Sequence, residues 1–254
     1  MTQREKAEEL RRLHTAPEPL VLVNAWDAVS ARVVADAGAS AIATASWSIA
    51  AARGYDDGEQ IPLDEMLDSV RVVARAVDLP VTADLERGFG DAGSTVARAI
   101  EAGAVGCNLE DSTGNGGLVP VEAHVAAVAA ARAAGEAAGV PLVINARTDV
   151  FLEGLEFDEA VERARAYLAA GADVVFVPGV SDIDKLEQLV IKIRGPISVF
   201  GGAGGPNLEE LARLGIARVS YGPGPLGVAM AALGRAAKGL LGGGDPPAEL
   251  ANRP

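Results

Sequence analysis

Asp84 and Glu86 close an apolar run at residues 79–85, and Gly88 and Gly90 follow them. Side chains two residues apart on a strand share a face, so the two carboxylates would stand together at that strand's C-terminal end. Such a pair suits a hard divalent cation, and the glycines would let the next loop approach a ligand closely. A single acid pair can equally cap a helix or stay solvated, so the surrounding elements have to decide.

The chain alternates between two periodicities. Eight short apolar runs resemble strands, at residues 20–24, 41–46, 81–85, 106–110, 142–147, 174–178, 197–201 and 218–222. Stretches with helical spacing lie between and after them, at residues 30–37, 63–76, 94–102, 121–137, 157–170, 182–193, 208–214 and 226–241. This pattern predicts a (β/α)8 barrel of the TIM type with an N-terminal helix. A doubly wound sheet is the alternative, disfavoured because no G-x-G-x-x-G motif follows the first strand.

Composition narrows the classes of partner. The 254 residues are 49% apolar and 4% aromatic, which indicates a globular aliphatic core. We expect one barrel domain, residues 1–241, followed by a flexible tail, residues 242–254. A formal net charge of −13 argues against a nucleic-acid partner. The charged N-terminus, without any run of about 18 apolar residues, argues against a membrane segment and predicts a cytoplasmic protein.

Polar residues gather where the predicted strands end. Barrel enzymes place catalytic groups at the C-terminal ends of their strands, so these residues would meet on one rim. Asn108 with Glu110, and Asn145 with Arg147, also share a strand face by parity. The rim set comprises Asn24, Asp27, Ser46, Ser48, Asp84, Glu86, Asn108, Glu110, Asp111, Asn145, Arg147 and Asp149.

The rim lacks the side chains of several common chemistries. No lysine follows a predicted strand, which disfavours a Schiff base, and both histidines fall in predicted helices. The single cysteine alternates out of phase with Asn108 and Glu110, so it should face the helices as core. The lysines are Lys6, Lys185, Lys192 and Lys238, the histidines are His14 and His124, and the cysteine is Cys107. The remaining candidate for the catalytic group at the rim is a divalent ion held by oxygen ligands.

Mg²⁺ keeps several waters, so Asp84 could bind it directly while Glu86 and Glu110 hold coordinated waters. The ion would chelate a small anionic 2-oxoacid and stabilise the enolate formed when a bond at the adjacent carbon breaks. Mn²⁺ is the alternative ion. Arg147 would supply a fork for a carboxylate or an oxyanion. An ion pair of Arg147 with Asp149 or Glu110 is a competing role, and the two roles can coexist.

Five ordered segments resemble the isocitrate lyase/phosphoenolpyruvate mutase superfamily. They are N-A-W-D-A-V-S-A-R (24–32), A-T-A-S-W-S-I-A-A-A-R-G-Y-D-D-G-E (43–59), A-D-L-E-R-G-F-G (83–90), N-L-E-D (108–111) and N-A-R-T-D (145–149). The resemblance covers nearly all of residues 19–241. It implies a modified barrel that binds Mg²⁺ and a 2-oxoacid, assembled as a homo-oligomer, a dimer or tetramer, in which the last helix is a candidate for exchange between subunits.

The resemblance also assigns roles by position. It implies Asp84 as the direct metal ligand, Glu86 as the second acid of a D-x-D pattern, and Glu110 as the acid that holds a metal-bound water. It implies a catalytic set of Asp57, Glu110 and Arg147, and a substrate-binding set of Ser46, Trp47, Ser48 and Asn145, with the first three in a loop. Trp47 departs from the family, where a small residue is commoner, and puts substrate size in question.

The segment after Asp111 departs further. It reads S-T-G-N-G-G-L-V-P and lacks the K-[KR]-C-G-H loop whose cysteine handles a proton in isocitrate and methylisocitrate lyases. Isocitrate cleavage is therefore not expected, although the short loop could still act as a lid. The leading hypothesis is a carbon–carbon lyase or an oxaloacetate-type decarboxylase. Phosphonopyruvate mutase or hydrolase chemistry and a non-catalytic 2-oxoacid-binding barrel are the alternatives. A phosphate site at the glycine-rich stretches 201–206 and 222–225 is a further hypothesis.

Overall fold

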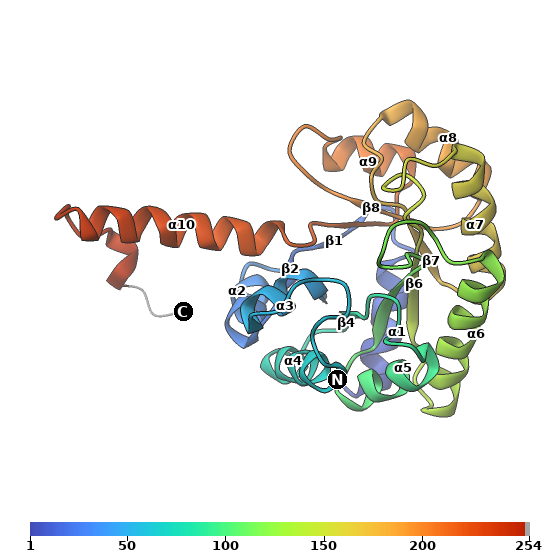
Figure 1. Ribbon diagram of the computed structural model, residues 1–254, viewed down its shortest axis with the longest axis horizontal. Helices are drawn as coiled ribbons and strands as arrows, with labels where there is room; N and C mark the ends of the chain where they lie inside the picture. The colour runs from blue at the N-terminus through green and yellow to red at the C-terminus, as the bar shows by residue number, and fades with distance from the viewer. Residues whose placement is uncertain (252–254) are drawn as a thin grey trace.

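Nine parallel strands run around one barrel, as a computed structural model that describes residues 1–251 shows (Figure 1). The strands are β1 (Leu20–Leu22), β2 (Asn24–Ala25), β3 (Ile42–Thr44), β4 (Val81–Asp84), β5 (Gly106–Glu110), β6 (Val143–Arg147), β7 (Val174–Phe176), β8 (Ile197–Phe200) and β9 (Arg218–Ser220). β1 pairs with β9 and β2 pairs with β3, so the two short strands are halves of one strand interrupted at Val23. The predicted eight-stranded barrel is confirmed.

The helices alternate with these strands. They are α1 (Gln3–Leu13), α2 (Ala28–Asp36), α3 (Ser46–Arg53), α4 (Leu63–Ala76), α5 (Ala92–Glu101), α6 (Val121–Ala137), α7 (Phe157–Ala169), α8 (Ile183–Ile193), α9 (Leu208–Leu214), α10 (Gly224–Leu241) and the 3-10 helix η1 (Ala248–Ala251). The sequence pattern missed α3. Ser46, Trp47 and Ser48 form its first turn instead of a loop, and Gly54 ends it in the left-handed conformation at φ 85°.

The core lies between the barrel and its helices because each helix is apolar on one side. In α5, the buried residues Ala92, Thr95, Val96, Ala99 and Ile100 follow the i, i+3, i+4, i+7, i+8 spacing of a helix face. On β5, the outward-facing side chains Cys107 and Leu109 are buried in the same cluster. The expectation that Cys107 is a core residue is confirmed.

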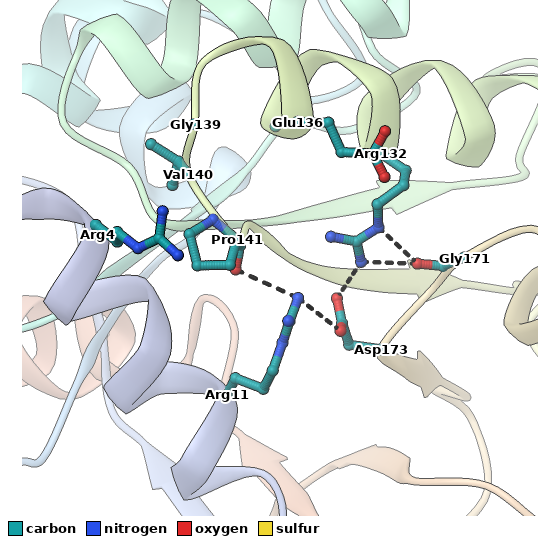
Figure 2. A pocket seen from close by; sticks show the side chains of 10 residues that line it. Arg4, Arg11, Arg132, Glu136, Gly139, Val140, Pro141, Gly171 and Asp173 are labelled. Atoms are coloured by element: carbon teal, nitrogen blue, oxygen red, sulfur yellow. Dashed lines mark hydrogen bonds and ion pairs between the residues drawn. The ribbon is translucent and has the colours of Figure 1, made fainter.

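α1 covers the bottom of the barrel, opposite the polar rim. A Cβ atom at Gly106 would lie 2.8 Å from Leu10 Cδ2, so only glycine lets this helix approach β5. Arg11 of α1 and Arg132 of α6 both pair with Asp173, with the Arg11 ion pair at 3.2 Å (Figure 2). A cavity of about 530 Å³ lies here, and both guanidinium groups also donate to backbone carbonyl oxygens around it. These contacts join α1 and α6 to Asp173, so the role of this cluster is structural.

His14, at the C-terminus of α1, is buried and neutral. Its Nδ1–H donates to the Leu10 carbonyl oxygen at 2.7 Å, and burial, with the nearby charge of Arg218, lowers its pKa from 6.5 to about 4. The unfolded chain therefore binds a proton more readily than the folded chain, and stability is lost as the pH falls from 6.5 towards 4.

We expect the free energy of unfolding to fall by about 2 kcal/mol between neutral pH and about pH 5 because of this one group. Urea denaturation of the wild type and of His14→Gln at both pH values isolates the effect, since every other titrating group is common to both proteins. An equal pH dependence in the two proteins would contradict the assignment.

α10 stands away from the barrel (Figure 1). Leu226 is buried, whereas Val228, Leu233 and Leu241 are 72%, 61% and 90% exposed. η1 follows it, and the last part of the predicted tail, residues 252–254, lies outside the described residues. Among the helices of residues 1–251, none has both the length and the apolar character needed to cross a bilayer.

Candidate active site

A cavity of about 400 Å³ opens at the C-terminal ends of the strands, where the polar rim was predicted. Five predicted site residues line it, namely Ser46, Trp47, Asp57, Asp84 and Arg147. Ser48, Glu86, Glu110 and Asn145 do not line it. Asn24 and Asn108, which were predicted for the rim without a named role, also line the cavity, as do Leu152, Phe176, Phe200 and Ser220, which were not predicted. Their positions at strand ends were the available signal for most of them.

Asp84 is held at the end of β4 by two neighbouring elements. Its backbone N–H donates to Thr44 Oγ1 at 2.9 Å, and its Oδ2 accepts from the backbone N–H of Ser46 at 3.1 Å. The carboxylate therefore faces the N-terminus of α3, where the helix dipole favours negative charge. The first intrahelical bond of α3 runs from the Ile49 N–H to the Ala45 carbonyl, so the N–H groups of Trp47 and Ser48 precede it.

Glu86 lies just beyond β4 in the left-handed conformation, at φ 49°. Its Oε2 accepts from the backbone N–H of Glu59 at 2.5 Å, while its buried Oε1 has no hydrogen-bond partner within the described chain. Burial, together with the charges of Asp57 and Asp84, raises the pKa of Glu86 to about 8. A buried carboxyl oxygen without a partner is costly, and a metal-bound water would supply the missing donor.

Glu110 ends β5 and points at Arg147. Its Oε2 lies 2.8 Å from Arg147 Nη1, and its Oε1 accepts from Ser112 Oγ at 2.7 Å. Burial raises the pKa of Glu110 to about 7, although Arg147 opposes this shift. The carboxyl group is thus fixed at the rim.

Arg147 is held by two acids at once. Its Nε and Nη2 donate to the two carboxylate oxygens of Asp149 at 2.6 and 2.9 Å, while Nη1 contacts Glu110. Its guanidinium carbon lies 5.9 Å from the centre of the Phe176 ring. Burial lowers its pKa, but the two carboxylates outweigh burial and the net shift is upward. Both competing ion pairs therefore exist, and the same guanidinium still lines the cavity.

The acids fit a metal site in which water molecules supply most of the ligands. Within residues 1–251, no three His, Cys, Asp or Glu side chains are close enough together to bind one ion directly. Asp84 lines the cavity, whereas Glu86 and Glu110 do not, and besides burial the charges of Asp84 and Glu110 both raise the pKa of Glu86. Mg²⁺ takes one or two direct carboxylates and keeps its waters, so this arrangement matches its preferences.

The segment after Asp111 forms a short hairpin. Ser112 and Leu118 make an antiparallel bridge, and the Gly117 N–H donates to Glu153 Oε2 at 2.6 Å. Asp111 is fully buried and accepts from Tyr167 at 2.6 Å, so its role is structural. The hairpin is tied to the loop after β6, and it carries no cysteine, lysine or histidine.

The glycine-rich loops after β8 and β9 adjoin the site. A cavity of about 350 Å³ lies among Gly179, Ser181, Phe200 and residues 202–205, and it shares Gly179 and Phe200 with the main cavity. A phosphate site there stays a prediction.

Comparisons with known proteins agree with this geometry. Residues 10–241 match the family described as phosphoenolpyruvate phosphomutase. The chain is 33% identical to an oxaloacetate decarboxylase of Bradyrhizobium sp. (strain BTAi1), covering 97% of this chain and 88% of that protein. A crystal structure from Burkholderia cenocepacia J2315, provisionally assigned as a phosphonomutase, is 47% identical, with a TM-score of 0.89 and coverage of 93% and 98%. A phosphonopyruvate hydrolase solved with oxalate and Mg²⁺ is 26% identical, with a TM-score of 0.88 and coverage of 98% and 92%.

Proposed function

The chain belongs to the phosphoenolpyruvate phosphomutase family, within the isocitrate lyase/PEP mutase superfamily, and from this we propose that it is a Mg²⁺-dependent lyase acting on a small 2-oxoacid. Decarboxylation of oxaloacetate is the first candidate reaction, supported by the relative that carries this activity in its name. The observation that carries the proposal is the convergence of Asp84 and Arg147 in one cavity, together with the buried, unpartnered Oε1 of Glu86, whose pKa is raised by burial and by the charge of Asp84.

Asp84 would hold the ion directly, and Glu86 and Glu110 would accept hydrogen bonds from its waters. When bound there, Mg²⁺ would neutralise negative charge that develops on the carbonyl oxygen of the substrate. Mn²⁺ has similar ligand preferences and could replace it. The related hydrolase with oxalate and Mg²⁺ supports this choice.

The protein's own side chains would orient the substrate and limit its size. The guanidinium of Arg147 offers donors in a fixed fork, which fits a carboxylate or a carbonyl oxygen that gains charge. In oxaloacetate, the bond between C3 and the leaving carboxylate breaks and its electron pair moves towards the carbonyl, so no base is needed to begin. Trp47, Leu152 and Phe176 line the same cavity and would limit the size of the group on C3.

Phosphonopyruvate chemistry is the second candidate, favoured by the 47% identity to the protein provisionally assigned as a phosphonomutase. A panel of oxaloacetate, substituted malates, 2-methylisocitrate and phosphonopyruvate, assayed with and without Mg²⁺, separates the candidates. Pyruvate C3 proton exchange, followed by NMR, reports enolate formation independently of the leaving group. Binding of these ligands without exchange or turnover would favour the non-catalytic barrel.

We propose that the protein is a homo-oligomer in which α10 packs on another subunit. Four large apolar side chains on α10 are at least half exposed, namely Val228, Met230, Leu233 and Leu241, and exposed apolar side chains gathered on one element are typical of an interface. A dimer and a tetramer are both compatible with it, and a cytoplasmic location stays a prediction of the sequence.

Leu233→Asp should therefore shift the oligomer towards smaller species, because it places a charge in the packed face. Arg235→Glu on the same helix is the matched control, since that exposed position already carries a charge. Sedimentation velocity gives the mass of each variant. Equal masses for the wild type and Leu233→Asp would contradict the proposal.

A further inference from the structure

A fully buried arginine lies inside the barrel and contacts the wall of the active-site cavity. Arg218, on β9, has no exposed surface, and its Nη2 donates to Asn108 Oδ1 at 3.1 Å. Its Nε and Nη1 have no hydrogen-bond partner within residues 1–251. Burial lowers the pKa of Arg218 to about 10, with Asp84 opposing the shift, so the side chain is still a cation at neutral pH.

This arginine fixes which way the Asn108 amide points. A guanidinium only donates hydrogen bonds, so the atom of Asn108 that faces it must be the oxygen. Asn145 Nδ2 donates to the same oxygen at 2.8 Å. Two donors occupy the two lone pairs of Oδ1, and the amide nitrogen of Asn108 is left over.

The amide nitrogen of Asn108 is free to meet a ligand in the cavity. Asn108 lines the cavity and is 8% exposed, and within residues 1–251 its Nδ2 makes no hydrogen bond and keeps some accessible surface. We infer that this nitrogen faces the cavity. Asn24, which lines the same cavity, differs. Its Nδ2 donates to the Thr44 carbonyl at 2.9 Å and its Oδ1 accepts from the Tyr221 N–H at 3.0 Å, so both amide atoms are committed to the protein.

We propose that Asn108 is a substrate-binding residue whose amide N–H donates to an anionic oxygen of the 2-oxoacid, and that Arg218 is the positioning residue that holds this amide in its donating orientation. The proposal rests on the proposed function and adds a specificity element to it. An acid at position 108 would face the same neighbours but would present a charged oxygen to an anionic ligand. The arrangement therefore selects a ligand with an oxygen acceptor at that point of the cavity.

Asn108→Asp tests this directly, because it keeps the shape and the two hydrogen bonds that position 108 accepts. A carboxylate beside Arg218 should leave the melting temperature unchanged or higher. The donor to the ligand is lost, so we expect affinity for oxalate in the presence of Mg²⁺ to fall roughly 10- to 100-fold by isothermal titration calorimetry. A structural role alone for Asn108 predicts unchanged oxalate affinity.

Two control variants separate the loss of the donor from the added charge. Asn24→Asp adds the same charge to the same cavity, although it also loses the bond to the Thr44 carbonyl, and it should lower affinity less than Asn108→Asp. An equal loss in a variant that melts at the wild-type temperature would assign the effect to charge and overturn the proposal. Asn108→Ala removes the donor without adding charge and should also weaken oxalate binding, and unchanged affinity would contradict the proposal.

Arg218→Lys keeps a buried cation and should bind oxalate better than Arg218→Met, in which only the Asn145 amide still donates to Asn108 Oδ1. Equal affinities in these two variants would overturn the positioning role. The wild type is the reference for the proposed function: if it binds no oxalate with Mg²⁺, both proposals fail. If it binds oxalate and Asn108→Asp binds equally well, only this inference fails.

Discussion

Asp84→Ala is expected to lower kcat/KM for the Mg²⁺-dependent reaction by at least ~1,000-fold, the largest effect of any single change in this site. Asp84 is the only acid of the proposed metal set that lines the cavity. Its neighbours Glu86 and Glu110 are held by other groups, at 2.5 Å from the Glu59 nitrogen and 2.8 Å from Arg147, so neither is free to move into its place.

The same variant should lose its thermal response to the ion. A ligand at about 100 times its Kd stabilises a folded protein by about 2.7 kcal/mol. Mg²⁺ should therefore raise the melting temperature of the wild type and leave the melting temperature of Asp84→Ala unchanged. Asp56→Ala is the matched control, because Asp56 is an exposed acid next to the site. Full Mg²⁺-dependent turnover in Asp84→Ala would refute the assigned ligand.

Arg147→Lys is expected to lower kcat/KM roughly 100-fold while the protein remains folded. Lysine keeps a positive charge between Asp149 and Glu110, but a single ammonium cannot donate to both oxygens of Asp149 and also reach the substrate. The defect should therefore come from geometry and not from charge. Steady-state kinetics, with melting temperatures as a check on folding, measure it.

Arg147→Met should lower both the activity and the melting temperature more than Arg147→Lys does. It leaves Asp149 and Glu110, both largely buried, without their shared cation, and such groups are costly to bury. We expect a clear drop in melting temperature together with loss of activity. Arg53 is an exposed arginine paired with Asp68, so Arg53→Lys is the control for Arg147→Lys: it makes the same chemical change away from the cavity. Activity of Arg147→Lys equal to that of the wild type would exclude a role for the fork.

Local pattern was enough to place the barrel and its rim. The sequence pattern put Asp84, Asn108, Glu110 and Arg147 at or near strand ends. In the structure, Asp84, Glu110 and Arg147 are the last residues of β4, β5 and β6, and Asn108 lies two residues before the end of β5. These properties follow from nearest neighbours in the sequence, since alternation and helical spacing reflect which face of an element is buried. The missed helix α3 shows the limit of this approach, because it has only eight residues, five of them serine or alanine, and so carries little periodicity.

The sequence by itself determined the eight strand–helix units and the acids and the arginine at one end of them, and it disfavoured lysine, histidine and cysteine chemistry there. Only the tertiary structure decided which of these residues reach the cavity, how Arg147 is shared between Asp149 and Glu110, and which way the Asn108 amide points. The reason is physical. A strand's own residues fix its two faces, whereas the orientation of Asn108 depends on Arg218, 110 residues away in the chain, and contacts of that kind exist only after the barrel has closed.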